Sequence, residues 1–230
     1  MQSVGEVMSI GRTFRESLQK AYRSLEVGLD GLESKPVAKG DPDLNRARSL
    51  DMSTLRYGTA FRLLKVRQAF LEGQSIEDIF NITKIDPWFL NQIKMLAESS
   101  NNSELLELKQ QGFSDKQIGR IKGKTEIEIR KLRKQQSILP SFKVVDTCAA
   151  EFEAETPYCY STYDDENEIE PLEGKKIIIL GGGPNRIGQG IEFDYCCVQA
   201  VFGLRDQGLK TIMVNCNPET VSTDFDLVDR

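Results

Sequence analysis

The 230-residue sequence contains no histidine. Histidine is the usual proton shuttle near neutral pH and a common metal ligand, so its absence excludes Ser-His-Asp and Cys-His catalysis and His-based metal sites. Any chemistry would have to rest on carboxylates, Arg, Lys, backbone amides or a bound cofactor.

Cysteines and long apolar runs are also scarce. The five cysteines, at positions 148, 159, 196, 197 and 216, contain no CxxC pair. We interpret them as reduced thiols that only pack. No apolar run approaches the roughly 20 residues of a membrane helix. The first residues also lack the basic and apolar segments of a secretory signal. We therefore expect a cytoplasmic protein with no membrane partner.

The formal net charge is −5, which does not favour a general nucleic-acid binder. Residues 109–134 nevertheless carry nine Lys or Arg against three Asp or Glu. This basic stretch could be a nucleic-acid surface or a solvated helix face that meets an acidic partner. Its charges alternate with Ile127, Ile129 and Leu132 as on a surface helix, and no aromatic residue is present to stack on bases. We favour the second interpretation and keep a helix-turn-helix nucleic-acid-binding protein as the alternative.

Helical periodicity dominates the first part of the chain. It predicts a helix over 12–27 capped by Thr13, and a long helix over 53–71. Residues 73–82 then reappear, weakly but in register, as residues 112–121 at an offset of 39. In each copy a serine, Ser75 or Ser114, is placed to cap a short helix. A second helix follows each copy, over 87–96 and 125–135. The pattern predicts a helix-turn-helix pair used twice.

The last 56 residues are of a different type. An apolar strand over 175–180, a glycine loop over 181–190, a helix over 188–207 and a strand over 211–215 predict one right-handed, parallel β-α-β unit. Two parallel strands cannot cover their own faces. We therefore expect most of this second domain to lie outside the sequence.

The glycine loop does not match the common phosphate-binding patterns. A P-loop needs Lys and Ser or Thr where Gln189-Gly190 stands, and the dinucleotide fingerprint needs a third glycine where Arg186 stands. A weak dinucleotide site and a tight turn without ligand both stay open. Polar residues gather at this loop and at the strand ends, where open parallel sheets place ligands. They are Asn185, Arg186, Glu192, Asp194, Asn215 and Glu219.

At these residues the chain resembles the large subunit of carbamoyl phosphate synthetase. The matching segments are GGGPNRIGQGIEFDYCC at 181–197 and MVNCNPETVST at 213–223. Upstream, SVGEVM, IGRT and ESLQK within residues 3–20 resemble the end of that family's first synthetase half. NITKIDPWFL at 81–90 resembles its helical association domain, and VDTCAAEF at 145–152 and YSTY at 160–163 resemble its central segment.

The resemblance implies a mainly α-helical domain followed by a partial α/β, pre-ATP-grasp unit. The domains implied are the tail of the first synthetase half at 1–11, a helical oligomerisation domain at 12–145, an acidic connector at 146–174 and the truncated α/β unit at 175–230. The family joins ammonia from glutamine to phosphorylated bicarbonate, and a second ATP converts the carbamate to carbamoyl phosphate for arginine and pyrimidine biosynthesis.

The resemblance also implies cofactors and partners. The modules that bind ATP, Mg²⁺ and K⁺ would lie outside this chain. We therefore assign no catalytic, cofactor-binding or metal-binding residue here and expect no activity from the segment alone. The partners implied are the remainder of the large subunit, the glutamine amidotransferase small subunit and further copies through the helical domain.

One role is carried over residue by residue. In this family the matching loop and strand ends line the carbamate tunnel, which implies tunnel-lining roles for Arg186, Gly190, Glu192 and Glu219. Carbamate decomposes in water, so a shielded route is expected. An arginine among glutamates lines such a route without trapping an anion. The alternative is that Glu192 only complements a helix terminus and Gly190 only serves the turn.

Overall fold

The computed structural model describes residues 5–33, 52–152, 158–186, 191–217, 220–224, 226–227 and 229. These residues form two compact units. The helical unit consists of the described residues of 13–23 and 27–138. The α/β unit consists of the described residues of 1–12, 24–26 and 139–230.

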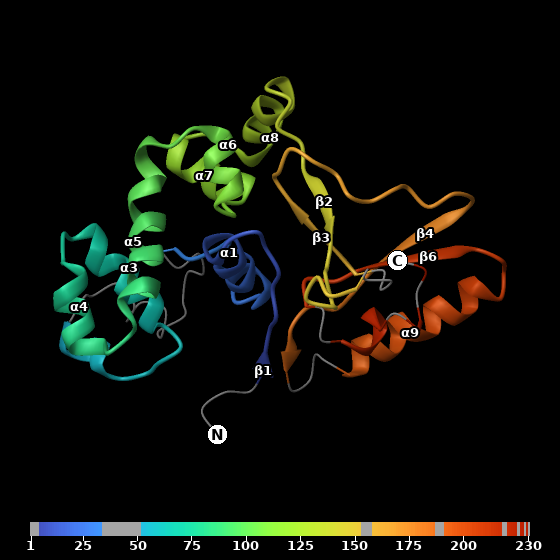
Figure 1. Ribbon diagram of the computed structural model, residues 1–230, viewed down its shortest axis with the longest axis horizontal. Coiled ribbons are helices and arrows are strands. Elements are labelled where there is room, and N and C mark those ends of the chain that lie inside the picture. The colour runs from blue at the N-terminus through green and yellow to red at the C-terminus, as the bar shows by residue number, and fades with distance from the viewer. Residues whose placement is uncertain are drawn as a thin grey trace. The chain divides into compact units, whose positions relative to one another are not determined.

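The helical unit is built from short helices (Figure 1). They are α1 (Phe14–Ser24), the 3-10 helix η1 (Met52–Arg56), α3 (Arg62–Leu71), α4 (Ile76–Thr83), α5 (Pro87–Asn102), α6 (Leu105–Gln110), α7 (Asp115–Lys122) and α8 (Glu126–Gln135).

The predicted repeat is confirmed in its helices and in its caps. The Ser75 hydroxyl accepts a hydrogen bond from the Asp78 amide at 3.1 Å, which begins α4. The Ser114 hydroxyl accepts from the Gln117 amide at 3.1 Å, which begins α7. Each cap satisfies an amide that the first helical turn leaves without a partner. The same local rule therefore starts the short helix in both copies.

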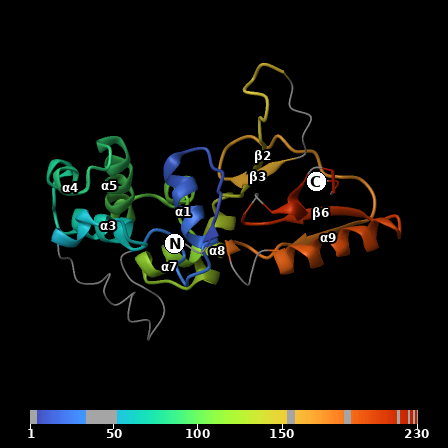
Figure 2. The same cartoon turned by 90° about the horizontal axis from the view of Figure 1, so that it is seen from below.

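Apolar faces of these helices form the core. Helix α5 packs against α3 and α4, and α7 packs against α8, as the grouping of α3, α4 and α5 in Figure 2 illustrates. The completely buried side chains include Leu55, Val66, Ala69, Ile79, Leu90, Leu96, Leu108, Ile118 and Ile129. The aligned pair Ile79 and Ile118 is buried in both copies, so the repeat is also a repeat of core positions.

The predicted helix over 53–71 is wrong in one respect. The structure breaks it into η1 and α3, and residues 57–61 between them form no helix. Gly58 and Thr59, which are poor helix formers, lie in the break. In addition, α5 runs six residues past its predicted end at residue 96, to Asn102, and the short helix α6 was not predicted.

The α/β unit contains an antiparallel pair that was not predicted. Strand β2 (Ser141–Val144) pairs with β3 (Cys159–Thr162), and Ser141 lies opposite Thr162. The buried Lys143 of β2 forms ion pairs with Asp164 at 3.7 Å and with Glu168 at 3.1 Å. Two acids of the stretch predicted as a connector are thus ion-paired inside this unit.

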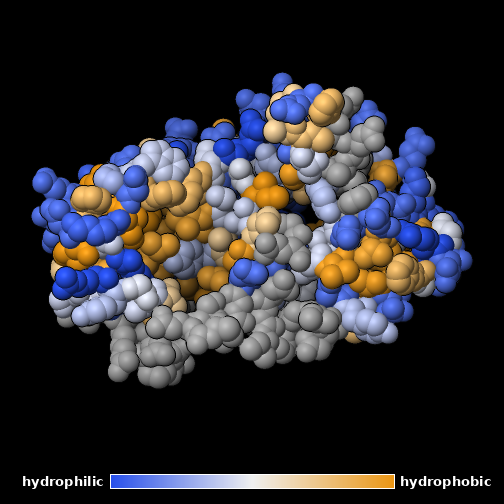
Figure 3. Space-filling view, turned by 60° about the horizontal axis from the view of Figure 1, so that its bottom comes forward, coloured by the Kyte–Doolittle hydropathy of each residue, from blue (hydrophilic) through white to orange (hydrophobic). Residues whose placement is uncertain are grey.

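The predicted β-α-β unit is confirmed. Strand β4 (Lys176–Leu180) pairs in parallel with β6 (Lys210–Val214), and α9 (Ile191–Arg205) lies between them in the chain and packs on the pair (Figures 1 and 2). Apolar strand residues are left exposed, with Ile178 at 60%, Leu180 at 75% and Val214 at 48%. Figure 3 shows apolar surface over this part of the molecule. The fold is a mainly α-helical domain followed by a partial α/β unit, as expected.

Across the described ranges, no helix has both the length and the apolar character needed to cross a membrane.

Candidate functional site

The glycine loop after β4 is closed by contacts from β6. The Gly181 amide donates to the Val214 carbonyl at 2.8 Å, and the Gly183 amide donates to Asn215 Oδ1 at 3.3 Å. A Cβ added at Gly181 would lie 2.5 Å from Asn215 Nδ2. Glycine is therefore required at 181 because the Asn215 side chain fills the space beside it.

Asn215 also organises the turn after β6. Its Oδ1 accepts from the Asn217 amide at 3.1 Å, and its Nδ2 donates to Thr220 Oγ1 at 3.0 Å. The buried Asp194 of α9 accepts from the Ser222 amide at 3.0 Å. The polar residues predicted at this edge thus include two, Asn215 and Asp194, that hold the backbone of the turn in place.

A segment distant in sequence joins this edge of the sheet. Ser24 Oγ donates to the Cys216 carbonyl at 3.0 Å. A Cβ added at Gly183 would lie 2.6 Å from Glu26 Oε1, so the Glu26 carboxylate lies directly against the loop. Burial raises the pKa of the Cys216 thiol; the Ser24 hydroxyl opposes this rise, and the negative charge of Glu26 adds to it. Sequence reasoning missed Glu26, because no local pattern links it to a loop so far along the chain.

The loop continues into a short strand, β5 (Asn185–Arg186), which pairs antiparallel with β1 (Gly5–Glu6). Gly5 lies opposite Arg186. Strand β1 therefore pairs with the backbone of β5, the strand that contains the predicted site residue Arg186.

The four predicted tunnel residues are only partly covered by the structure. Arg186 lies in β5 and Glu192 lies in the first turn of α9, but the side chains of both are outside the described residues. Gly190 and Glu219 are themselves outside the described residues. The tunnel role of all four stays a prediction.

The described part of the loop does not fit a nucleotide phosphate. A phosphate loop presents backbone amides to the anion, whereas here the amides of Gly181 and Gly183 already donate to Val214 and Asn215. The Glu26 carboxylate beside Gly183 would also repel a phosphate. Within the described residues, no group of three or more Cys, Asp or Glu side chains is arranged to hold a metal ion.

Part of the basic stretch is paired with acids inside the helical unit. Four of its nine basic side chains form ion pairs with acids of the same unit. The pairs are Lys109–Asp115 at 2.8 Å, Arg133–Asp115 at 3.2 Å, Lys116–Asp30 at 3.2 Å and Arg120–Asp30 at 2.7 Å. Paired side chains are less available to phosphates, and this weakens the nucleic-acid alternative.

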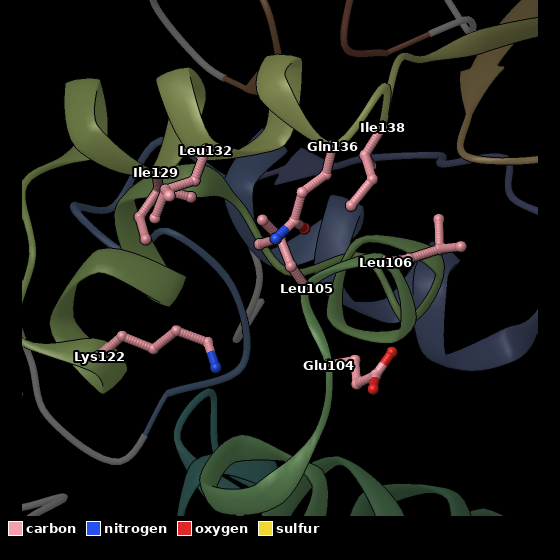
Figure 4. A pocket seen from close by; sticks show the side chains of 8 residues that line it. All are labelled: Glu104, Leu105, Leu106, Lys122, Ile129, Leu132, Gln136 and Ile138. Carbon is pink, nitrogen blue, oxygen red and sulfur yellow. The ribbon is translucent and has the colours of Figure 1, made fainter.

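A cavity of about 430 Å³ lies in the helical unit (Figure 4). It is lined by Leu105, Leu106, Ile129, Leu132 and Ile138, with Glu104, Lys122 and Gln136 beside them. The Lys122 ammonium donates to the Ser103 carbonyl at 3.4 Å. The charged group of Lys122 therefore hydrogen-bonds to the backbone of the helical unit itself.

The fold and the site together define a class: a module of paired helices followed by a parallel β-α-β unit, in which the described amides of the glycine loop at Gly181 and Gly183 are bonded to Val214 and Asn215. Residues 6–137 match the family model described as the carbamoyl-phosphate synthetase large chain, oligomerisation domain. Residues 173–230 match the carbamoyl phosphate synthase preATP-grasp domain. The chain belongs to the carbamoyl-phosphate synthetase large chain family.

Curated relatives agree with this assignment. The chain is 51% identical over 245 residues to the carbamoyl phosphate synthase large chain of Archaeoglobus fulgidus and 52% identical over 241 residues to that of Pseudomonas aeruginosa. A third relative, the large chain of Vibrio cholerae, is 51% identical over 241 residues. Each alignment covers 100% of this chain but 22% of the relative. The chain therefore spans about a fifth of the length of the large chains it matches.

Proposed function

We propose that this chain serves as the central segment of a glutamine-dependent carbamoyl phosphate synthase large chain, an ATP-dependent carbon–nitrogen ligase of arginine and pyrimidine biosynthesis. The observation that carries the proposal is the alignment of the whole chain with large chains at about half identity. In this proposal residues 12–145 provide the association domain, 146–174 the connector and 175–230 the opening of the second synthetase half, with 1–11 ending the first half.

The proposed partners are the remainder of the large chain, the glutamine amidotransferase subunit and further copies through the helical domain. ATP, Mg²⁺ and K⁺ would be bound by other parts of the enzyme, because the described part of the glycine loop does not fit a phosphate. All five cysteines are free thiols, which suits a cytoplasmic location. The chain alone is proposed to be inactive, and ATP turnover by the purified chain would contradict this.

The strand-end loop is proposed to line the route of carbamate between the two synthetase halves. Arg186, Gly190, Glu192 and Glu219 are the lining residues. Two features support this: the loop lies at the carboxyl edge of a parallel sheet, where such sheets place ligands, and its internally bonded amides leave it unsuited to holding a phosphate. A lining that does not retain anions is what a carbamate route needs.

The test is Gly190→Phe in a complete large chain that carries this sequence, assembled with its amidotransferase subunit. A blocked route predicts loss of overall carbamoyl phosphate synthesis while both ATP-dependent partial reactions persist. Gly203→Phe is the matched control, because nothing lies within 4 Å of a Cβ at this position of α9. Normal synthesis by Gly190→Phe would refute the route.

No observation on the described residues favours the nucleic-acid-binding alternative, and the ion pairs of the basic stretch count against it.

A further inference from the structure

The first turns of α1 and α5 carry three aromatic rings in mutual contact. The ring centroid of Phe14 lies 5.4 Å from that of Trp88 and 5.2 Å from that of Phe89. The centroids of Trp88 and Phe89 are 4.9 Å apart. All three pairs meet edge to face, an arrangement that aromatic pairs favour. The rings therefore hold one another in a defined geometry within the helical unit.

These rings are open to solvent. Trp88 is 53% exposed and Phe89 is 43% exposed. Met95, which is 37% exposed, lies two helical turns after Trp88 on the same face of α5. Single exposed apolar side chains are common, but apolar side chains that gather at one exposed place mark interaction sites. Phe14, Trp88, Phe89 and Met95 are called the aromatic patch below.

Arg15 lies beside the aromatic patch. Its Nη1 atom donates to Met95 Sδ at 3.0 Å, and a thioether sulfur is a weak acceptor. Its Nε atom is buried and has no hydrogen-bond partner among the described residues. A guanidinium forms its strongest contacts with carboxylates, often through two parallel hydrogen bonds. The Arg15 side chain is therefore poorly satisfied by the helical unit alone.

The composition of this surface is that of a binding hot spot. Tryptophan and arginine are the residues that most often carry the free energy of protein contacts, and phenylalanine and methionine are enriched in them. A complementary partner would place an apolar side chain against the rings of Trp88 and Phe89. It would also bring a carboxylate to the Arg15 guanidinium.

The charge and the small extent of the patch favour one kind of partner over another. In a two-fold contact with a second copy the patch would face itself, which would bring two Arg15 cations together. A stable contact between separate chains also takes roughly 20–30 residues on each side. A partner in the same polypeptide needs less, because the link gives it a high effective concentration. The chain covers 22% of each curated relative, so the larger part of a large chain could supply such a partner.

We propose that the aromatic patch, together with Arg15, is the surface through which the helical unit docks on the remainder of the large chain. The docked segment presents an apolar side chain and a carboxylate. The inference rests on the proposed function of the chain as a central segment. It adds a specific contact surface within one large chain, separate from any contact between copies.

The first test measures the oxidation of side chains by hydroxyl radicals, followed by mass spectrometry. It compares the purified chain with a complete large chain that carries this sequence and is assembled with its amidotransferase subunit. Trp88 should oxidise at least about fivefold more slowly in the complete chain, because its exposure falls from 53% to roughly a tenth in an interface core. Tyr57, which is 67% exposed in the same unit, is the reference. Equal oxidation of Trp88 in both samples, or equal slowing of Trp88 and Tyr57, overturns the proposal.

Two variants of the complete large chain test the two parts of the surface. The double variant Trp88→Ser with Phe89→Ser removes the aromatic anchors and should raise the oxidation rate of Met95 at least about threefold, toward its rate in the purified chain. Arg15→Leu removes the cation and should raise the oxidation rate of Trp88 in the complete chain but not in the purified chain. The matched control is Ile127→Ser, on α8 of the same unit, which should leave both rates unchanged. Rates equal to those of the unsubstituted complete chain in both test variants refute the docking role.

A dilution series of the purified chain separates the other occupants. Protection of Trp88 that grows with concentration assigns the patch to a second copy and overturns the proposal. Strong protection at every concentration means that the chain covers its own patch, which also overturns it. Carbamoyl phosphate synthesis by the complete enzyme is measured in the same preparations. Normal synthesis with an unprotected Trp88 refutes the docking surface and leaves the proposed function standing, whereas an enzyme that synthesises no carbamoyl phosphate contradicts the proposed function itself.

Discussion

The ammonium of Lys109 lies 2.8 Å from Oδ1 of Asp115, and the Lys109 side chain is only 6% exposed. The second oxygen of Asp115 lies 3.2 Å from Arg133 Nη2, so one carboxylate holds two cations. Lys109 also donates to the Phe113 carbonyl and Arg133 to the Ile138 carbonyl. This network ties α6, α7 and α8 together and fixes the part of the helical unit that carries the second repeat.

Asp115→Asn is expected to destabilise the helical unit strongly. The substitution leaves the buried cations of Lys109 and Arg133 without their counter-charge, and breaking a buried pair in this way typically costs about 3–5 kcal/mol. Urea-induced unfolding followed by circular dichroism measures the change. Glu98→Gln serves as the control, because it breaks only an exposed pair with Lys94 and should cost about 0.5 kcal/mol or less. If the two variants unfold at the same urea concentration, the ion-pair network contributes little to the free energy of unfolding.

The same carboxylate predicts an acid dependence of stability. Burial alone would raise the pKa of Asp115, but the ion pairs with Lys109 and Arg133 outweigh it and hold this pKa below its ordinary value. A lowered folded-state pKa stabilises the fold above the unfolded pKa of about 3.9, and this contribution is lost as the pH falls through the folded pKa. Melting temperatures between about pH 5 and pH 2 should therefore fall more steeply for wild type than for Asp115→Asn. Parallel curves would contradict this assignment.

The two serine caps allow the repeat itself to be tested. Ser75→Ala and Ser114→Ala each remove the acceptor of one helix-starting amide, and each should cost about 1 kcal/mol. In the second copy Gln117 Oε1 also accepts from the Ser114 amide at 3.0 Å, and this bond can persist in the alanine variant. Chemical denaturation of both variants should give similar losses. A loss at only one of the two positions would mean that the repeated caps are not energetically equivalent.

The sequence predicted those parts of the fold that local rules decide. The repeated helices were predicted from the capping residues Ser75 and Ser114 and from apolar periodicity. The β-α-β unit was predicted from the apolar strands on either side of the glycine loop and its helix. The break between η1 and α3 was missed because apolar periodicity continued through Gly58. The pairing of β2 with β3 was missed because each strand is only four residues long and many residues separate the two strands along the chain.

Only those parts of the candidate site that are formed by residues close together in sequence could be predicted. The loop and Asn215 were recognised from the order strand, glycines, helix and strand. The contact of Glu26 with Gly183 and the pairing of Gly5 with Arg186 depend on chain segments that meet only in the folded α/β unit. No periodicity or spacing encodes such contacts, so the structure was needed to find them.

The exposed strands of the α/β unit predict self-association of the purified chain. Ile178 and Leu180 are 60% and 75% exposed on β4, although strands of this apolar type are normally covered on both faces. Exposed apolar strands promote edge and face contacts between copies. The double variant Ile178→Thr with Leu180→Thr should therefore remain monomeric at higher concentration than wild type in sedimentation velocity, because threonine keeps β propensity and lowers the apolar area.

The matched control is Ile127→Thr, which removes an apolar side chain that is 66% exposed on α8 of the helical unit. If the sheet drives association, this control should associate as wild type does. Association that persists in the double variant and disappears in Ile127→Thr would place the contact on the helical unit instead. That result would fit an association domain that forms oligomers without the rest of the large chain. The two outcomes therefore distinguish contact through an incompletely covered sheet from contact through a surface that belongs to the helical domain.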